Sequence, residues 1–398
     1  MPTIARPMAD RLNFAVERIS DEAAFAHLKP EWSQLLKLGA SGCLFLTWEW
    51  LYTWWKHLAA NRQLAILAVR CADELTAVAP FCIRPPSLSR RCPFPVLEFL
   101  GSGYVGSDYL DFIIHKDYEP EVLTLLASHL RGERLVFDWA QLKRCGSHAA
   151  EVAFRLREEG WRISETGMSV SPFIPLSGKS WESYLATLGA EHRYNFHRKW
   201  KRLNKDYVVQ FEQVRTDQQC REAIDLLISL HNLRWNERGG SDAFHTPDLV
   251  EFHREFSRIA LEHGWLRLYI LRLNGKPAAS LYGFLYGRTF YFYQSGFDPS
   301  YAKYSVGLVT MGLAIENAIS EGAEEYDLLH GNEDYKSHWS CDSRELRRLS
   351  LYPPGNLGLF YRSSAEFERA SRTIARRLLP KSIVDGIRTK WNARQGPS

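Results

Sequence analysis

Apolar and polar positions along the chain repeat with two different periods, which predicts helices and strands in alternation from end to end. In the first half, a tryptophan-rich helical pattern covers 45–58, and strand patterns cover 64–70 and 75–84 and recur in the runs VLEFLG and DYLDFII. In the second half, helical patterns fill QCREAIDLLISLHNLRW, TPDLVEFHREFSRIALEHG and VGLVTMGLAIENAISEG, and strand patterns fill LRLYILRL, PAASLYGFLYG, TFYFYQSGF and EYDLLHG.

Particular residues indicate where some of these elements begin, turn and end. Thr246 followed by Pro247 is typical of a helix start, because threonine can cap the first turn and proline fits the first helical position. The pair Asn274-Gly275 between two strand patterns predicts a tight hairpin, since both residues tolerate positive φ. Gly322 is typical of the position that follows a helix end.

The order of elements in the first half is repeated in the second, so that 64–84 corresponds in plan to 266–286. A duplicated α/β unit explains this repeat. The segment SPFIPLSGKS, rich in proline, glycine and serine, indicates a boundary near residues 170 to 180. We therefore expect an α/β fold with mixed sheets, built from tandem units at 1–175 and 176–355 and followed by a basic helical tail at 356–398.

Composition narrows the class of protein. A chain of 398 residues, 45% of them hydrophobic, is long enough for two packed domains. No stretch of about 18 apolar residues occurs and the first twenty residues lack the apolar run of a secretory signal, so we expect a cytoplasmic protein. The seven cysteines lie far apart without a C-x-x-C pair, which favours reduced, mostly buried thiols over disulfides or a metal site.

The net charge of +4 is too small to indicate nucleic-acid binding by itself, but the charge is concentrated in two places. Residues 192–205 interleave six Lys and Arg with Tyr194, Phe196 and Trp200, a mixture that suits phosphates and stacked bases. The solvated face of an amphipathic helix explains the same pattern, and we favour that interpretation. The basic tail could dock on the body of the protein or make peripheral contact with an anionic membrane.

Common catalytic motifs are absent from the sequence or lack their context. GSGYVG at 101–106 fits a dinucleotide-binding pattern, but the strand-like SDYLDFII follows it where that site needs a helix. We expect a glycine-rich loop there, beside which Asp108 and Asp111 either line a cleft and bind substrate or lie in solvent. No H-E-x-x-H, P-loop or G-x-S-x-G motif occurs, which disfavours a zincin, a P-loop NTPase and an ordinary serine hydrolase.

A polar strand end containing Gln294 and Ser295 leads through a short loop into a helix that starts near Ser305 and Gly307. Helix N-termini suit anions such as phosphate, although Ser305 could equally act as a simple helix cap. Before these strands, the segment 229–246 places His231, Arg234 and Trp235 near the end of another helix. Arg234 could anchor an anionic substrate, whereas packing is the expected use of Trp235.

The stretch EYDLLHGNEDYKSHW at 325–339 collects many titratable side chains at the end of an apolar strand. Together with the helix and loop before it, this stretch resembles GNAT-type acyltransferases, specifically the CelD-like branch, which is similar to the tandem-GNAT FemAB aminoacyltransferases. The resemblance covers roughly residues 25 to 352 and is carried by Gly296, Tyr304, Ser305, Gly307, Gly322, Asp327, Gly331, Glu333, Tyr335, Lys336 and Trp339. Tyr304–Val309 keeps the central glycine of the family's R/Q-x-x-G-x-G/A loop but lacks its first and last residues, and His330 stands where relatives often have arginine.

The resemblance implies a thioester donor, either acyl-CoA or an acyl carrier protein, and no metal. It implies donor contacts from Gln294, Ser295, Tyr304, Ser305 and Gly307. The expected substrate contacts are Asp108, His231, Arg234, Trp235 and Asp327. Amine acylation needs a base and stabilisation of negative charge. We therefore expect His330 to act as base, with Glu333 as its substitute, Tyr335 as proton donor and Lys336 as partner of a phosphate or oxyanion.

Three functions stay open at the level of sequence. The leading one is acyl transfer to an amine or a sugar hydroxyl, which the family resemblance associates with cell-envelope or exopolysaccharide synthesis. The second is tRNA-dependent aminoacyl transfer of the FemAB kind. The third is an inactive GNAT scaffold that binds a partner in polysaccharide synthesis.

Overall fold

The strands of the protein form two sheets in the computed structural model, which describes residues 13–87, 94–236, 243–331, 333–340, 342–356 and 358–364. A sheet of four strands has the order β1-β3-β4-β7, and a sheet of eleven strands has the order β10-β11-β12-β13-β14-β9-β15-β8-β6-β5-β2. The strands are β1 (Phe14–Ile19), β2 (Gln63–Leu64), β3 (Ile66–Cys71), β4 (Glu74–Ala79), β5 (Phe81–Arg84), β6 (Val96–Phe99), β7 (Ile113–Ile114), β8 (Val136–Lys143), β9 (Arg162–Pro175), β10 (Val209–Gln213), β11 (Leu266–Leu273), β12 (Lys276–Tyr286), β13 (Thr289–Phe297), β14 (Glu325–Asp327) and β15 (Asp342–Tyr352).

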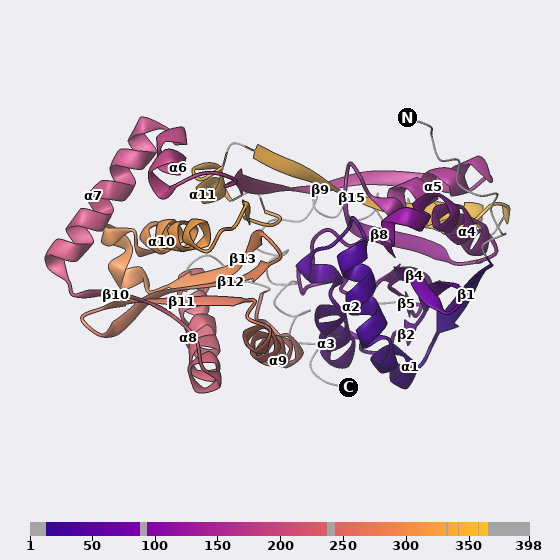
Figure 1. The fold of residues 1–398 in the computed structure, drawn as a ribbon, viewed down its shortest axis with the longest axis horizontal. Coiled ribbons are helices and arrows are strands. Elements are labelled where there is room, and N and C mark those ends of the chain that lie inside the picture. The colour runs from indigo at the N-terminus through magenta and orange to yellow at the C-terminus, as the bar shows by residue number, and fades with distance from the viewer. Residues whose placement is uncertain are drawn as a thin grey trace, which may run out of the picture.

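Helices cover both sheets and form the ends of the molecule (Figure 1). They are α1 (Glu22–His27), α2 (Lys29–Leu38), α3 (Trp48–Leu58), α4 (Glu119–Arg131), α5 (His148–Glu158), α6 (Trp181–Thr187), α7 (Ala190–Asp206), α8 (Asp217–Asn236), α9 (Pro247–Glu262), α10 (Val306–Ser320) and α11 (Asp334–Ser337). Short 3₁₀ turns lie at η1 (Leu44–Leu46), η2 (Lys116–Tyr118) and η3 (Pro299–Tyr304).

The two halves of the chain share one strand topology, as the sequence repeat predicts. In the second half β11, β12 and β13 pair antiparallel in turn, α10 crosses over, and β14 returns parallel to β13. In the first half β2 and β5, then β5 and β6, pair antiparallel, α4 crosses over, and β8 returns parallel to β6. The expected mixed α/β fold is confirmed by this topology. The boundaries given above for the two units stay a prediction.

The last strand of each half pairs with a strand of the other half. β9 ends the first half yet pairs with β14, and β15 ends the second half yet pairs with β8. β9 and β15 also pair with each other over eleven residues, from Asp342 opposite Phe173 to Tyr352 opposite Arg162. Figure 1 shows these two long strands running across the top of the molecule and joining its two lobes. Because of this exchange, side chains from distant parts of the sequence can meet between the lobes.

A shared core also holds the lobes together below these strands. The Trp50 ring from α3 lies with its centroid 4.7 Å from that of Phe256 on α9 and 5.7 Å from that of Tyr293 on β13. Trp50 is fully buried. Its indole N–H donates to Ser107 Oγ at 2.9 Å, so the core fixes the glycine-rich loop of the first half against the second.

Several predicted element ends are confirmed. The Thr246 side chain accepts a hydrogen bond from Leu249 N at the start of α9, and Pro247 is the first residue of that helix. Asn274 and Gly275 adopt φ values of 51° and 77° in the β11–β12 turn, as a type I′ hairpin requires. Gly322, two residues after α10 ends, has φ 79°.

Other elements differ from their prediction. The tryptophan-rich helix starts at Trp48 rather than 45, after the 3₁₀ turn η1. The run DYLDFII yields only β7, because the Asp111 carboxylate turns away to accept hydrogen bonds from His148 N and Ala149 N at the start of α5. EYDLLHG likewise forms a strand only over β14.

Five cysteines of the described residues carry free thiols, and three of them are buried: Cys43, Cys82 and Cys220. Among the helices of the described residues, none is both long and apolar enough to cross a membrane. The predicted basic tail falls mostly on 365–398, which lie outside the described residues.

Candidate active site

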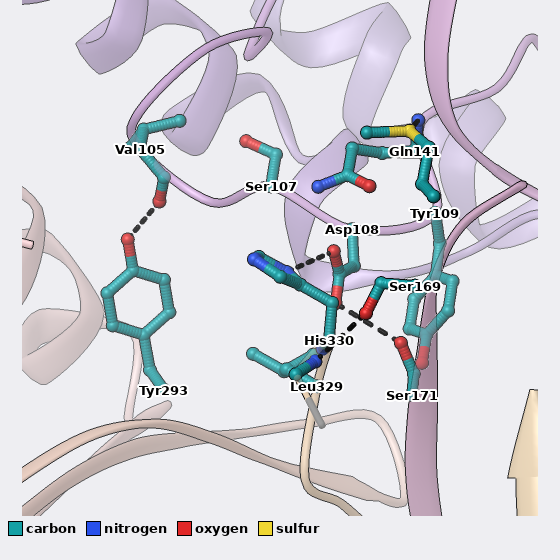
Figure 2. Close-up of polar contacts among 12 residues, drawn as sticks. Val105, Ser107, Asp108, Tyr109, Gln141, Ser169, Ser171, Tyr293, Leu329 and His330 are labelled. Carbon is teal, nitrogen blue, oxygen red and sulfur yellow. Dashed lines mark hydrogen bonds and ion pairs between the residues drawn. The ribbon is translucent and has the colours of Figure 1, made fainter. Parts of the chain in front are cut away.

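A hydrogen-bonded Asp–His pair joins the two halves of the molecule. His330 follows β14 in the second half, and Asp108 follows the glycine-rich loop of the first half. His330 Nδ1 lies 2.7 Å from Asp108 Oδ1, and the His330 backbone N–H donates to Asp108 Oδ2 at 2.7 Å. Figure 2 shows the contact of the ring, with the His330 ring extending from the 329–331 segment toward the loop that carries Val105 and Ser107. The two oxygens of one carboxylate thus fix both the backbone and the ring of His330.

This geometry prepares His330 to accept a proton. An ionised carboxylate can only accept hydrogen bonds, so Nδ1 carries the proton and Nε2 keeps its lone pair. Among the described residues, none hydrogen-bonds Nε2. The Asp108 side chain is fully buried, whereas the His330 side chain is 39% exposed. Burial alone would lower the pKa of His330, but the charge and hydrogen bond of Asp108 outweigh burial and raise that pKa above its ordinary value.

A second hydrogen bond crosses the same junction beside the pair. The Tyr109 hydroxyl donates to Asp327 Oδ2 at 2.7 Å, and Arg344 Nη1 approaches the same oxygen at 3.3 Å. Asp327 Oδ1 accepts from Leu329 N at 2.8 Å. Burial raises the pKa of Asp327 to about 7, although the Tyr109 hydroxyl, the Leu329 N–H and Arg344 all act to lower it. The Asp327 side chain is 1% exposed, so it supports the segment that carries His330 rather than facing solvent.

Left-handed backbone conformations are concentrated at this junction. Tyr109 has φ 60°, Leu329 φ 55° and Gln141, shown nearby in Figure 2, φ 61°. Such conformations cost non-glycine residues on the order of 1 kcal/mol each and persist only where the surrounding structure holds them. Tyr109 and Leu329 are the neighbours of Asp108 and His330, so this backbone geometry places the pair.

The segment after His330 is held by Lys336. Its buried ammonium donates to His330 O at 2.8 Å and to Leu329 O at 3.3 Å, and it lies 3.1 Å from Glu333 Oε2. All three partners belong to the turn around Gly331. Lys336 and Glu333 therefore pair with each other, and His330 has the freer position for proton transfer.

The strands open beside His330. β13 and β14 pair in parallel only as far as Tyr291 and Asp327. Beyond that point the chain that follows β14 leaves β13, because Leu328 N and Gly331 N donate to the carbonyl oxygens of Pro172 and Val170 on β9. The end of β13 and the His330 segment consequently diverge. On the first-half side, the Tyr293 hydroxyl donates to Val105 O, as Figure 2 shows.

A second group of predicted residues lies at the end of β13. Ser295 Oγ accepts from Arg234 Nη1 at 3.1 Å, and Ser295 O lies 3.1 Å from His231 Nδ1. The Arg234 guanidinium lies 5.5 Å from the centre of the Tyr335 ring. Burial lowers the pKa of His231 to about 4, and burial and Glu333 raise that of Tyr335, so both side chains are neutral near pH 7. Gln294 Oε1 accepts from Ser295 N at 3.0 Å, and the Trp235 side chain lies outside the described residues.

The predicted anion site lies at the start of α10. Ser305 has φ 54°, and its side chain makes no capping hydrogen bond, which does not support the simple cap. Tyr304 donates to Asp206 Oδ2 at 2.9 Å. A Cβ at Gly307 would lie 3.3 Å from the Phe297 ring, whose centre lies 5.1 Å from the Arg234 guanidinium. Phe297 therefore connects the start of α10 to the group around Ser295.

Sequence reasoning identified both members of the central pair but not that they meet. It treated Asp108 as a substrate contact and His330 as an isolated base, and it missed Tyr109, Arg344 and Tyr293. Asp108 and His330 stand 222 positions apart, and no local pattern encodes such a contact. A histidine followed by glycine at a strand end, and a carboxylate beside a glycine-rich loop, were the available signals. Among the described residues, no cluster of three or more His, Cys, Asp or Glu side chains could hold a metal ion.

Comparisons with known proteins agree with this architecture. Residues 190–337 match the family model described as an acetyltransferase (GNAT) domain. The crystal structure of FemX is 12% identical, with a TM-score of 0.59 over 83% of this chain and 96% of that one. A protein of unknown function from Bacteroides thetaiotaomicron is 15% identical, with a TM-score of 0.51 over 85% of this chain and 99% of that one. The C-terminal domain of a proposed lysylphosphatidylglycerol synthetase from Agrobacterium fabrum is 11% identical, with a TM-score of 0.50 over 86% of this chain and 96% of that one. No curated protein matches. At these identities, the solved structures show a shared fold.

Proposed function

Because residues 190–337 form a GNAT acetyltransferase domain in a chain with a FemAB-like fold, we propose that this protein is an acyltransferase that uses His330 as its general base. The acyl group moves from a thioester donor to an amine or a sugar hydroxyl. The observation that carries this proposal is the 2.7 Å contact between His330 Nδ1 and the buried Asp108 carboxylate, which leaves Nε2 as a proton acceptor.

The proposed step is direct transfer. The acceptor nitrogen or oxygen attacks the thioester carbonyl, a C–N or C–O bond forms, and the C–S bond breaks. The proton of the acceptor passes to His330 Nε2, and Asp108 stabilises the resulting imidazolium. The departing thiolate takes a proton from Tyr335 or from water, and the raised pKa of Tyr335 means that this hydroxyl holds its proton near pH 7.

We place the donor along the opening between β13 and the His330 segment. Its phosphate would bind the first turn of α10, where Gly307 offers its backbone N–H, Ser305 offers its hydroxyl, and the helix dipole favours an anion. Gln294 and Ser295 would border its thioester end. In this arrangement Arg234 would face the acceptor. The donor would be acyl-CoA or an acyl carrier protein. An acceptor from cell-envelope or exopolysaccharide synthesis follows from family resemblance alone.

The test is thiol release from hexanoyl-CoA or hexanoyl-pantetheine in the presence of a panel of amines and amino sugars. We expect His330→Ala to lower turnover about 10²- to 10⁴-fold, the usual contribution of a general base, while donor binding measured by calorimetry is retained. Glu333→Gln is the matched variant and should retain more activity, because Glu333 pairs with Lys336. Equal turnover in wild type and His330→Ala would rule out this role for His330.

Two alternatives give different results in the same assay. If the donor is an aminoacyl-tRNA, ribonuclease would abolish product formation, and the protein would not consume the thioesters. An inactive scaffold would bind neither hexanoyl-CoA nor hexanoyl-pantetheine, and a His330→Ala/Glu333→Ala double variant would keep its partner.

A further inference from the structure

One face of α7 carries a row of exposed cations. Arg198, Lys201, Arg202 and Lys205 stand at spacings of three and four residues, which places them on the same side of a helix. All four are exposed, while Phe196 and Leu203 bury the opposite side of α7. We call these four residues the basic face of α7. It spans about 10 Å along the helix axis.

Within the described part of the chain, the basic face is largely without acidic partners. Asp206 lies 3.9 Å from Arg202, and its other contact is the Tyr304 hydroxyl. No described carboxylate lies within 4.0 Å of Arg198, Lys201 or Lys205. Lys199 stands among these cations. Burial, and then the charges of Arg198 and Arg202, lower its pKa. A concentration of like charge of this kind is relieved when an anionic partner binds.

The basic face adjoins the end of the molecule where the donor phosphate is proposed to bind. Lys199 Nζ donates to Lys303 O at 2.9 Å, in the 3₁₀ turn that leads into α10. The Arg202 guanidinium and the Lys303 ammonium lie 5.1 Å and 5.0 Å from the centre of the Tyr304 ring, directly before Ser305. Figure 1 shows α7 at the outer edge of the second-half lobe.

We propose that the basic face of α7 docks an acidic helix of an acyl carrier protein, whose phosphopantetheine arm enters beside the start of α10. This inference rests on the proposed thioester function and selects between its two donors. Cations at i, i+3, i+4 and i+7 match carboxylates with the same spacing on a partner helix, and charge complementarity fixes register and speeds encounter. A free coenzyme would not need a row of cations along two helical turns.

The shape of the basic face favours a protein helix over RNA. Specific nucleic-acid interfaces bury roughly 1,000 Å² or more and are strongly basic across that area. Here the charge follows one helix of a protein whose net charge is +4.

Binding of a fluorescently labelled hexanoyl acyl carrier protein to the full-length protein is measured by fluorescence anisotropy. The test variant is Arg198→Glu/Lys201→Glu/Lys205→Glu. The control variant is Lys37→Glu/Arg162→Glu/Lys116→Glu, which reverses three exposed cations on the first half of the chain. Hexanoyl-pantetheine binding, measured by calorimetry, reports whether the donor channel is intact in every variant.

We expect the α7 variant to weaken carrier-protein binding about tenfold or more, because attraction becomes repulsion, and to leave hexanoyl-pantetheine binding within about twofold. The control variant should bind the carrier protein within about threefold of wild type, since its charges lie elsewhere.

Equal effects of the two triple variants would overturn the docking proposal, and so would a wild type that binds hexanoyl-pantetheine but not the carrier protein. Preferential binding of tRNA or of anionic vesicles by the wild type, lost in the α7 variant, would assign the basic face to that partner instead. A protein that binds none of the thioesters would refute the proposed function itself.

Discussion

At the scale of single residues, Gly331 controls the position of His330. Its φ of 139° lies in a region that L side chains rarely adopt, and a Cβ there would stand 2.1 Å from Glu333 Oε2 and 2.6 Å from Lys336 Nζ. Both neighbours are ends of flexible side chains. They would move aside, and the Lys336 bond to the His330 carbonyl would be lost.

We therefore expect Gly331→Ala to lower the free energy of unfolding by about 1–3 kcal/mol and to reduce turnover. Gly103→Ala is the matched control, because Gly103 also has a positive φ, of 106°, but nothing within 4 Å of an added Cβ. Urea unfolding of both variants measures the difference. If the two variants lose equal stability, the clash at Gly331 has no consequence.

Residue identity indicated which side chains to consider for the site, but not which of them meet. His330 could be selected because a histidine at a strand end has a useful pKa, and Ser305 because a serine before a helical pattern marks a helix start. The partnership of His330 with Asp108 depends on how β9 and β15 join the two halves, and so it required the structure.

At the scale of elements, local signals predicted what local forces determine. The Asn274-Gly275 hairpin and the Thr246-Pro247 helix start are confirmed because backbone conformation and capping decide them. The runs DYLDFII and EYDLLHG were expected to be longer strands than they are. The apolar residues of both runs are buried, but Tyr109 and Leu329 take left-handed conformations. The Asp111 and Asp327 carboxylates accept hydrogen bonds from outside their own runs. Periodicity cannot distinguish such buried loops from strands.

At the scale of the whole molecule, the buried Asp327 couples stability to pH. Burial raises its pKa to about 7, far above that of an unfolded aspartate. Its contribution to stability is therefore complete below about pH 4 and is lost as pH rises through 7, because the unfolded chain releases the proton first.

We predict that Asp327→Asn removes this loss. The free energy of unfolding of Asp327→Asn relative to wild type should rise between pH 5 and pH 8, by on the order of 2 kcal/mol. Denaturant titrations at both pH values measure it, with Asp73→Asn, which removes an exposed carboxyl, as the control. A difference that stays constant with pH would show that Asp327 is ionised throughout.

The central claim is that Asp108 prepares His330 as the base, and the pH dependence of kcat/KM in wild type and Asp108→Asn tests it most directly. For the wild type, we predict an acidic limb above the ordinary histidine pKa of about 6.5, because Asp108 raises the pKa of His330. In Asp108→Asn the limb should move down by about one pH unit or more, since the imidazolium loses its carboxylate partner. The plateau should fall about 10²- to 10⁴-fold, because the ring is no longer held with Nε2 free. An unchanged limb and plateau in Asp108→Asn would contradict the account.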